Sequence, residues 1–237
     1  MQPHYLPWMG YFELIRLADK FMFLDDVDTP VGRSFVNRTK VQLDSVTKWL
    51  SIPIDSNTKN GSLLNLRASS ENWPITHKGI IENWYRGYRK LNSTLDLIFN
   101  EQLDSRIVES NIRQVTKIND CLGINTTFSR SSTFDVVEKS SMRLIKLCQL
   151  MNANVYITGH GGFKYLDHQL FQEHGIQVKY IIYSWDLNNL AHGSDAPYFS
   201  SFDYLVRDNL NWEMRAKSSL VDWSDFQEGM IGFQNGS

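Results

Sequence analysis

The sequence predicts an α/β fold: a single domain with a mostly parallel sheet and flanking helices. Short apolar runs alternate with segments of helical periodicity, which is the pattern of α/β proteins. Residues 154–183 show the pattern of strand, glycine-rich turn, helix and strand within about 30 residues, the length of a βαβ unit. A right-handed crossover makes its two strands parallel. Because no shift in composition marks a boundary, residues 1–237 are expected to form one domain.

Apolar spacing and proline define the elements expected in the first half of the chain. Pro3 and Pro7 cannot lie inside a regular helix or strand ladder, so residues 2–10 are expected to form a loop. Residues 55–72 are polar and rich in serine and asparagine, so they are expected to form a mobile loop, the best candidate for a lid. The elements expected from periodicity are a helix over 11–18, strands over 21–24, 35–43 and 49–54, and helices over 77–91, 95–103 and 106–122.

The last third of the chain carries the most regular pattern. Leu144, Ile145 and Cys148 recur on one face of an amphipathic helix expected over 138–152. Gly175 is expected to end a later helix as its C-cap. The elements that follow the amphipathic helix are a β-branched strand over 154–158, a glycine-rich turn, a helix over 165–174 and a second strand over 177–183.

The charge balance and the cysteine pattern exclude several classes of function. The chain has 24 Lys+Arg and 26 Asp+Glu, a net charge of −2, so no polyanion-binding surface is indicated and nucleic acid is not an expected partner. No apolar run is long enough to span a membrane, and the N-terminus lacks the regions of a signal peptide, so a cytoplasmic protein is expected. Cys121 and Cys148 are expected to be small core residues, and no histidine or cysteine spacing indicates a zinc site.

The first candidate site is the N-terminal segment, where two prolines fix a loop that runs into a helix. Gly10 permits close backbone approach at that helix start, and helix N-termini bind anions through their free N–H groups. Polar and aromatic side chains crowd the segment, namely Gln2, His4, Tyr5 and Tyr11. A purely structural loop is the alternative, and it explains the prolines but not this crowding.

The second candidate is the acidic pair Asp25 and Asp26 at the end of a predicted strand, which is where open α/β sheets bind ligands. Carboxylates at that place can take a proton from an amine or hydroxyl, hold a divalent cation or bind sugar hydroxyls. Arg33, Asn37, Arg38 and Lys40 follow, and the basic residues among them could bind a diphosphate. A solvated surface turn is the alternative interpretation.

The third candidate is the turn Gly159-His160-Gly161-Gly162 after a predicted strand. Successive backbone N–H groups can form an anion-binding nest, and His160 could act as a general acid or base. The turn matches neither the dinucleotide fingerprint nor the P-loop, so a purely geometric role is the alternative. His77, which lies near a tryptophan at a helix start, is a further candidate for the lining of a site.

Several segments resemble the WbqC-like protein family. The opening QPHYLPWMGYFELI, then DKFMFLDDVD and RSFVNRTKV carry the resemblance, and WLSIPI, RLIKLC, VYITGHGG and GIQVKYIIY extend it. The order and spacing match to about residue 183 and weaken beyond it. The resemblance singles out residues of the family's motifs, namely Gln2, Pro3, Tyr5, Pro7, Gly10, Tyr11, Asp25, Asp26, Asn37, Arg38, His77 and Gly159.

The resemblance also implies a function. Family members occur among bacterial O-antigen and surface-polysaccharide biosynthesis genes, where transfer of a glycyl-like group to an amino sugar has been suggested. It implies a transferase that places an acyl or aminoacyl group on the amine of a nucleotide-linked amino sugar. In that reaction Asp25 or Asp26 deprotonates the amine, Arg33 and Arg38 hold the diphosphate, and the turn at 159–162 binds the anionic part of the donor.

Two other functions stay open at this point. One is an adenylate-forming or nucleotidyl-transferring enzyme, since a proline-rich loop that enters a helix is loosely similar to such folds. The other is a non-catalytic glycan-binding or assembly protein. No cofactor follows from the sequence. The small-molecule partners implied by the resemblance are a nucleotide sugar and an acyl or aminoacyl donor.

The start of the chain carries one further expectation. Relatives in the family usually have a short apolar strand that leads directly into Gln-Pro, whereas only Met1 precedes Gln2 here. We therefore expect the first strand to be missing, which leaves a gap beside residues 21–24. The loop at 2–10 is then expected to be anchored at one end only, by Gly10 and the helix that follows.

Overall fold

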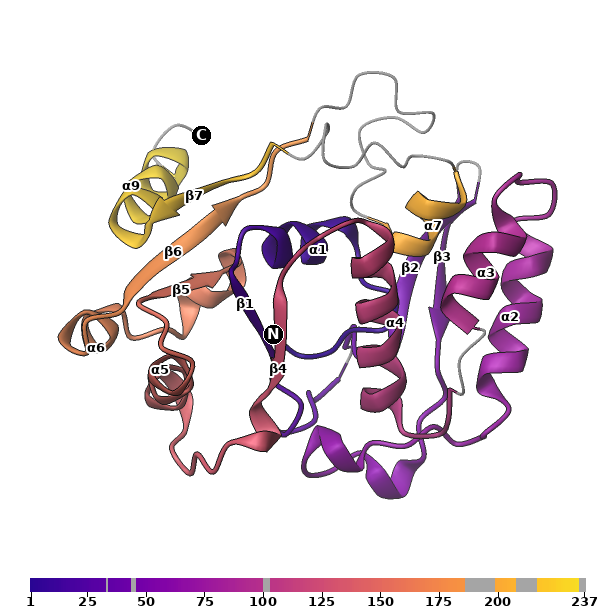
Figure 1. Ribbon diagram of the computed structural model, residues 1–237, viewed down its shortest axis with the longest axis horizontal. Coiled ribbons are helices and arrows are strands. Elements are labelled where there is room, and N and C mark those ends of the chain that lie inside the picture. Colours follow the sequence, from indigo (N-terminus) through magenta and orange to yellow (C-terminus); the bar gives the residue numbers. More distant parts are fainter. Residues whose placement is uncertain (33, 44–45, 100–102, 186–198, 208–216, 235–237) are drawn as a thin grey trace. The chain divides into compact units, whose positions relative to one another are not determined.

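The computed structural model forms two compact units. Unit 1 comprises Met1–Ser132 and Leu187–Arg215, and unit 2 comprises Thr133–Asp186 and Ala216–Ser237. The structure describes residues 1–32, 34–43, 46–99, 103–185, 199–207 and 217–234, and side chains of the last helix up to residue 229 (Figure 1). The expectation of one domain over residues 1–237 stays a prediction.

Within its described residues, unit 1 contains two small sheets with helices packed around them. The strands β1 and β4 pair in parallel, with Phe21 opposite Phe128, whereas β2 and β3 form an antiparallel hairpin. The strands of unit 1 are β1 (Lys20–Phe23), β2 (Arg38–Leu43), β3 (Val46–Ser51) and β4 (Thr127–Arg130). Its helices are α1 (Met9–Arg16), α2 (Trp73–Trp84), α3 (Leu91–Phe99), α4 (Ile107–Cys121) and α7 (Ser201–Val206).

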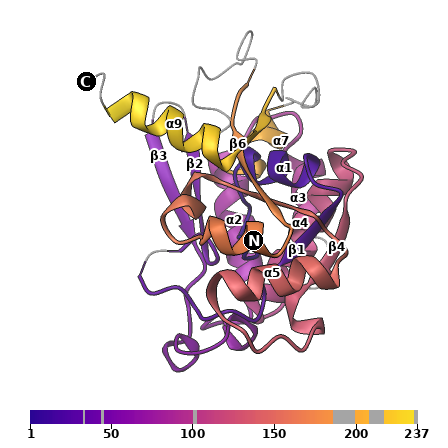
Figure 2. The same ribbon diagram turned by 90° about the vertical axis from the view of Figure 1, so that its left-hand side faces the viewer.

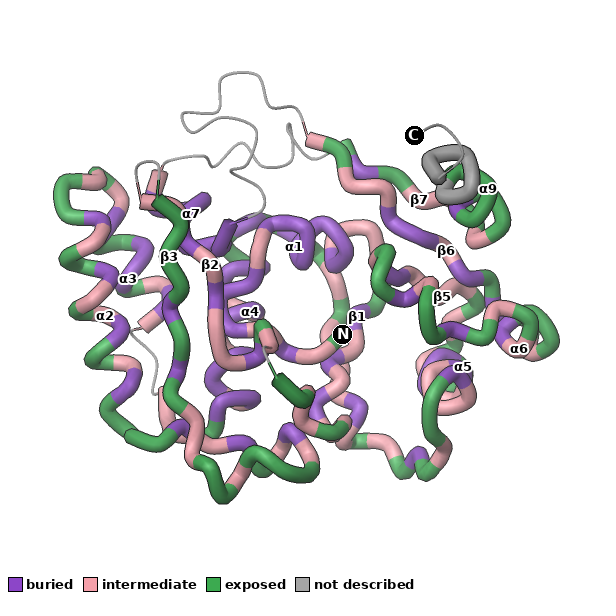
Figure 3. The backbone as a smooth tube through the Cα atoms, turned by 180° about the vertical axis from the view of Figure 1, so that it is seen from behind, coloured by how far each residue is buried: buried purple, intermediate pink, exposed green. Residues whose placement is uncertain are grey.

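The core of unit 1 lies around α1 and α4. Residues 9–15 of α1 are all buried, and α4 buries Val108, Val115 and Ile118 at helical spacing (Figure 3). The polar stretch at 55–72 is packed onto this core rather than free of it. Its Leu63 is buried and donates its N–H to the carbonyl of Val27 at 2.8 Å. The stretch is therefore an ordered part of unit 1 and lies beside the segment that follows β1.

Unit 2 is a three-stranded sheet with helices packed against it. Its central strand β6 (Gln177–Ile182) pairs in parallel with β5 (Val155–Thr158), which confirms the predicted parallel pair. On its other side β6 pairs antiparallel with β7 (Ser219–Asp222). The last helix packs on β6 and β7 (Figure 2). The helices of unit 2 are α5 (Ser140–Leu150), α6 (His168–Glu173) and α9 (Trp223–Gln234), and a 3₁₀ turn spans His160–Lys164.

The predicted fold class holds only in its coarser form. Helices and strands are mixed as expected, but the described sheets have two or three strands each, and parallel pairs are as frequent as antiparallel ones. The hairpin explains part of the difference. Its strands β2 and β3 are separated by two residues, and such a short connection can join only antiparallel strands.

The first residue of the chain lies at the outer edge of β1. The Met1 ammonium donates to the carbonyl of Met22 at 2.7 Å, and the N–H of Leu24 donates to the Met1 carbonyl at 2.8 Å. In a parallel sheet, a residue hydrogen-bonds to the residues before and after the one that it faces. Met1 bonds to Met22 and Leu24, so it faces Phe23 as a residue of a parallel strand would. The rest of a first strand, and the gap expected beside β1, stay predictions.

The N-terminal loop is anchored along its length, and not at one end only as expected. The N–H of Tyr5 donates to the carbonyl of Phe35 at 2.9 Å, and the N–H of Ser201 donates to the carbonyl of Pro7 at 2.8 Å. The carbonyl of Leu6 accepts hydrogen bonds from two hydroxyls, those of Thr39 and Ser200, at 2.8 and 3.1 Å. Because these bonds come from parts of the chain remote in sequence, sequence analysis did not reveal them.

The helices and cysteines complete the description of the two units. In the part of the chain that the structure describes, no helix is long and apolar enough to cross a membrane. Cys148 belongs to the core of unit 2, as expected, and burial raises the pKa of its thiol to about 11. Cys121 is exposed at the end of α4, so the expectation of a core residue is wrong there.

Candidate functional site

Three loops of unit 1 leave one edge of the β1–β4 pair. Because these strands are parallel, their carboxyl ends meet, and ligands of open α/β sheets bind at such edges. Met1 bonds to Met22 of β1 and to Leu24, which directly follows β1, so the loop that begins at Gln2 starts there as well. Asp25 and Asp26 follow β1, and Ser131 follows β4. The first and second candidate segments of the sequence thus lie at the same edge.

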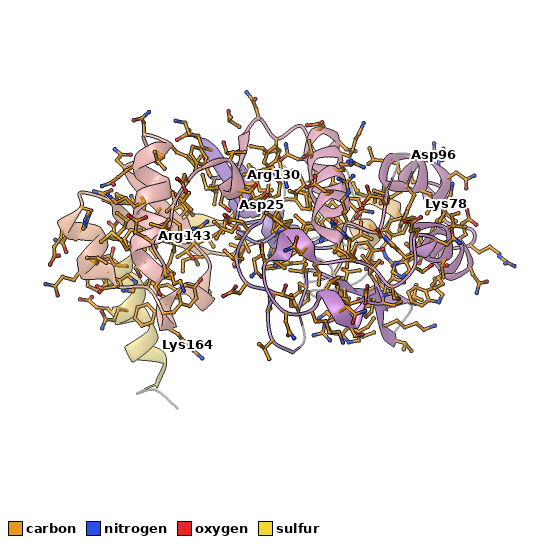
Figure 4. The ribbon with its side chains drawn as sticks, turned by 90° about the horizontal axis from the view of Figure 1, so that it is seen from below. Asp25, Lys78, Asp96, Arg130, Arg143 and Lys164 are labelled. Carbon is orange, nitrogen blue, oxygen red and sulfur yellow. The ribbon has the colours of Figure 1, made fainter. Side chains whose placement is uncertain are left out.

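Asp25 is a fully buried carboxylate with hydrogen bonds to both oxygens. Its Oδ2 accepts from Arg130 Nε at 2.7 Å and from the Ser132 hydroxyl at 2.7 Å, and its Oδ1 accepts from the Ser132 N–H at 2.9 Å. Figure 4 shows Asp25 and Arg130 side by side. Burial alone would raise the pKa of Asp25, but the bonds from Ser132 and Arg130 outweigh it and lower that pKa. Asp25 therefore stays ionised and holds the two strand ends together, which suits a positioning residue better than a base.

Arg130 joins this carboxylate to a second one. Its Nη1 and Nη2 donate to the two carboxylate oxygens of Glu109 on α4, at 3.0 and 2.6 Å. The guanidinium thus bridges Asp25 and Glu109 in the bidentate geometry that arginine favours. Sequence reasoning missed Arg130 and Glu109, since nothing local to either residue indicates that they meet.

Asp26 is the more accessible carboxylate of the pair. It is half-buried, and its Oδ1 lies 2.5 Å from the hydroxyl oxygen of Ser131. The same hydroxyl lies 3.1 Å from Asp25 Oδ1. Because the hydroxyl of Ser131 has one proton, it can donate to one carboxylate at a time, and the shorter distance favours Asp26. Asp26 is thus an oriented carboxylate at the sheet edge.

Tyr5 and His77 form a buried pair beneath the N-terminal loop. His77 Nε2 lies 3.2 Å from the carbonyl of Ser51, an acceptor, so Nε2 carries the proton and Nδ1 accepts from the Tyr5 hydroxyl at 2.8 Å. Burial raises the pKa of Tyr5 and lowers that of His77 to about 4, the latter opposed by the bond to Ser51. The ring of Trp73 packs edge-on against both rings. The buried hydrogen bond between Tyr5 and His77 therefore attaches the N-terminal loop to α2.

We expect unit 1 to lose stability between pH 6.5 and 4 because of His77. The pKa of His77 is near 6.5 when unfolded and about 4 when folded, so the unfolded chain binds the proton first. Stability present above pH 6.5 is therefore lost as the pH falls toward 4, by at most about 3 kcal/mol. Urea unfolding at pH 7 and 4.5 measures the loss.

The variant His77→Gln is the matched control for this prediction. A glutamine amide can accept from the Tyr5 hydroxyl and donate to the Ser51 carbonyl, but it does not titrate. We expect this variant to lose less stability between the two pH values than the native chain. A second variant, His4→Gln, separates the contribution of His4, whose pKa burial and the N-terminal charge also lower to about 4. Equal losses in the native chain and His77→Gln would contradict the prediction.

A strip of rings and one guanidinium lies beside the N-terminal loop. The ring of His4 lies 5.8 Å from that of Phe35, and Arg38 Cζ lies 4.3 Å from the Trp49 ring centroid. Phe35 is 48% exposed and Trp49 is 45% exposed, so both rings face solvent. We call these four residues the hairpin face, because Arg38 lies on β2 and Trp49 on β3.

Arg38 is the charged group of the hairpin face. Within the described residues no carboxylate forms an ion pair with it, and its buried Nε has no hydrogen-bond acceptor. A guanidinium stacked on an indole and free of carboxylates suits a planar or anionic ligand. Tyr11 contacts the hairpin face through His4, since the two ring centroids lie 5.2 Å apart. The Tyr11 hydroxyl donates to the carbonyl of Gln2.

The other predicted residues of the second segment have different places. The side-chain amide of Asn37 donates to the backbone carbonyl of Ile52 at 3.1 Å. The backbone carbonyl of Asn37 accepts from the N–H of Ile52 at 2.7 Å. This side chain therefore closes the base of the hairpin. Arg33 lies outside the described residues.

The third candidate segment belongs to unit 2. His160 is exposed, and its Nε2 donates to the carbonyl of Ile181 at 2.9 Å, so Nδ1 is left as its acceptor. Gly162 is explained by packing, since a Cβ there would lie 2.6 Å from the hydroxyl of Thr158. Nothing lies within 4 Å of a Cβ at Gly161, and the nearest atom to one at Gly159 is 3.6 Å away. The turn is thus open on its first part and packed at its end.

Comparison with known proteins places this chain in a family. The model of the WbqC-like protein family matches residues 2–211. The chain belongs to the WbqC-like protein family. The WbqC-like region contains the sheet edge of unit 1, the hairpin face and α7, and it ends before β7 and α9. The assignment agrees with the resemblance carried by the N-terminal segments.

One relative of this WbqC-like chain is a mycobacterial protein. The chain is 26% identical over 187 residues to the uncharacterized protein Rv1507c of Mycobacterium tuberculosis, a match that covers 77% of this chain and 80% of the relative. No solved structure matches the chain. The geometry of the site therefore carries the functional argument.

Proposed function

We propose that this WbqC-like protein is a cytoplasmic transferase of surface-polysaccharide biosynthesis. It places an acyl or aminoacyl group, such as glycyl, on the amine of a nucleotide-linked amino sugar. The observation that carries the proposal is the hairpin face: a guanidinium stacked on an exposed indole, with two further rings beside it. This arrangement offers a nucleotide base a surface to stack on and offers its diphosphate a cation.

Arg38 and Trp49 have complementary roles in the proposed complex. The guanidinium of Arg38 can bind two phosphate oxygens with parallel N–H groups. Among the described residues no carboxylate pairs with it, so phosphate binding breaks no ion pair there. The exposed ring of Trp49 packs against the base, and Phe35 extends the same surface. The face thus binds the part of the substrate that does not react, which leaves the sugar to reach the sheet edge.

Asp26 is the residue that we assign to proton transfer. The amine nitrogen attacks the carbonyl carbon of an activated donor, the new N–C bond forms, and the bond from that carbon to the leaving group breaks. Asp26 accepts the proton that the nitrogen loses, and Ser131 orients its carboxylate. Asp25 is the positioning residue, since the donors from Arg130 and Ser132 occupy its oxygens.

Binding of nucleotide-linked amino sugars tests the first half of the proposal. We expect a UDP- or dTDP-linked amino sugar to raise the melting temperature of the chain, and Arg38→Gln to weaken its affinity about tenfold, roughly the loss of one charge-assisted contact. The matched control is Arg89→Gln, which removes an exposed arginine elsewhere on unit 1. Absence of any shift with the native chain, or equal effects of the two variants, would overturn the proposal.

Turnover tests the second half. With an activated glycyl or acyl donor, Asp26→Asn should lower the rate of amide formation by about 100-fold, the usual contribution of a general base, while sugar binding is retained. Asp28→Asn, two residues further on and exposed, should change the rate little. A requirement for ATP and Mg²⁺ with release of pyrophosphate would select an adenylate-forming enzyme instead. Sugar binding without turnover by any donor would select a glycan-binding protein.

A further inference from the structure

Unit 2 contains a surface cavity of about 440 Å³ that the proposed transfer reaction does not use. Gln169, Gln172 and Glu173 from α6 line it, together with Trp223 at the start of α9. Ligand pockets typically measure about 300–1,000 Å³, so the cavity has room for one small molecule. The three α6 residues are three and four positions apart and therefore share one face of the helix. The cavity thus has an aromatic side and a polar side.

The aromatic side is fixed by a chain of contacts between neighbouring rings. The Trp223 indole lies 4.9 Å from the His168 imidazole at an interplanar angle of 25°, and His168 Nε2 lies 2.8 Å from the Tyr180 hydroxyl. The Tyr180 ring in turn stacks on Phe226 at 4.3 Å and 9°. The indole of Trp223 thus stacks on His168 and packs against the core of unit 2, and the same residue lines the cavity. A side chain that is already positioned loses little conformational freedom when a ligand binds.

The polar side carries a negative charge and two amides. Glu173 is exposed, and its Oε1 accepts from the Gln169 amide at 3.3 Å. No lysine or arginine among the described residues forms an ion pair with Glu173. The carboxylate therefore attracts a cation from solution. The amide groups of Gln169 and Gln172 each offer a donor and an acceptor, which matches neighbouring hydroxyl groups.

We propose that this cavity binds a hexose with a free amino group, its ring against Trp223 and its ammonium beside Glu173. The apolar C–H face of a sugar packs on an indole, and its hydroxyls suit the two amides. The ammonium is attracted by the indole face and by the carboxylate together. A neutral hexose lacks the second attraction, and an anionic ligand is repelled. This site is independent of the reaction proposed for unit 1, and it stands whether or not that reaction occurs.

Fluorine NMR of the full chain labelled with 5-fluorotryptophan tests the proposal. The signal of Trp223 is the one missing from the Trp223→Phe spectrum. We expect glucosamine to shift this signal with a dissociation constant on the order of 1 mM, whereas N-acetylglucosamine and glucose bind at least about fivefold more weakly. A Trp223 signal unchanged at about 50 mM glucosamine, or equal shifts with all three sugars, would overturn the proposal.

The variant Glu173→Gln isolates the role of the charge. It keeps the shape and hydrogen-bonding capacity of the side chain, so the unit stays folded while the carboxylate is lost. We expect the variant to lower the affinity for glucosamine about fivefold and to leave the affinity for N-acetylglucosamine unchanged. The matched control, Glu228→Gln, removes an exposed carboxylate of α9 and should bind both sugars as the native chain does. Equal glucosamine affinity in Glu173→Gln and the native chain would show that the amine is not recognised.

Discussion

Replacing Asp203 by asparagine should lower the free energy of unfolding of unit 1 by about 3 kcal/mol. Asp203 lies on α7 and is 3% exposed. Its Oδ1 accepts from Arg207 Nε at 2.8 Å and from the Tyr85 hydroxyl at 2.9 Å. The Arg207 guanidinium lies 5.0 Å from the Tyr88 ring centroid, and its side chain is almost fully buried. Asparagine keeps an acceptor for Tyr85 but removes the charge that compensates the buried cation.

An exposed ion pair of the same chain is the control. Lys179 Nζ lies 3.7 Å from Asp222 Oδ1, whose side chain is 55% exposed, so Asp222→Asn should cost less than about 1 kcal/mol. Urea unfolding of both variants measures the difference. If Asp203→Asn stays within about 1 kcal/mol of the native chain, burial of the pair does not contribute as argued.

The loss of stability that Asp203→Asn causes at α7 should extend to the N-terminal loop. Ser200 and Ser201 at the start of α7 hydrogen-bond to the carbonyls of Leu6 and Pro7. We expect amide exchange of Ser201, whose N–H donates to Pro7, to become faster in Asp203→Asn than in Asp222→Asn. Sequence analysis gave no element over α7. Its role depends on contacts with segments more than 100 residues away.

The elements that the sequence predicted are those whose pattern is local. The helix expected over 106–122 is observed as α4, because its apolar residues recur at helical spacing and face the core. The strands expected over 154–158 and 177–183 are observed as β5 and β6, because their short runs of β-branched and aromatic residues are also a local pattern. The strand expected over 35–43 begins only at Arg38, and the carbonyl of Phe35 accepts from the N–H of Tyr5 in the N-terminal loop.

The part of the site that was not predicted depends on long-range pairing. The strand β4 has one apolar residue, Phe128, in four, so no alternation identifies it. It is placed by β1, and the contact between Asp25 and Arg130 joins residues 105 positions apart. Sequence reasoning could therefore find Asp25 at a strand end but not its partners. It also treated Asp25 and Asp26 as equal candidates, which the geometry distinguishes.

Replacing Asp25 by asparagine should lower the free energy of unfolding of unit 1 by about 3–5 kcal/mol, the range for a broken buried ion pair. An asparagine amide would place N–H groups against the donors of Arg130 or Ser132, so a hydrogen bond is lost together with the charge. Since the pKa of Asp25 is lowered in the folded state, the native chain loses this stabilisation as the pH falls below about 4. Urea unfolding at pH 7 and 3.5 measures both effects.

The variant Asp26→Asn is the matched comparison, because the two residues are neighbours in the chain and share Ser131. Asp26 is half-buried, and an asparagine oxygen can accept the same hydrogen bond from the Ser131 hydroxyl, so asparagine there should cost less than about 1 kcal/mol. If Asp25 positions the strand ends and Asp26 transfers the proton, the first variant loses stability and the second loses amide formation. A stable Asp25→Asn chain with no activity would reverse the two roles and place the base at the buried carboxylate.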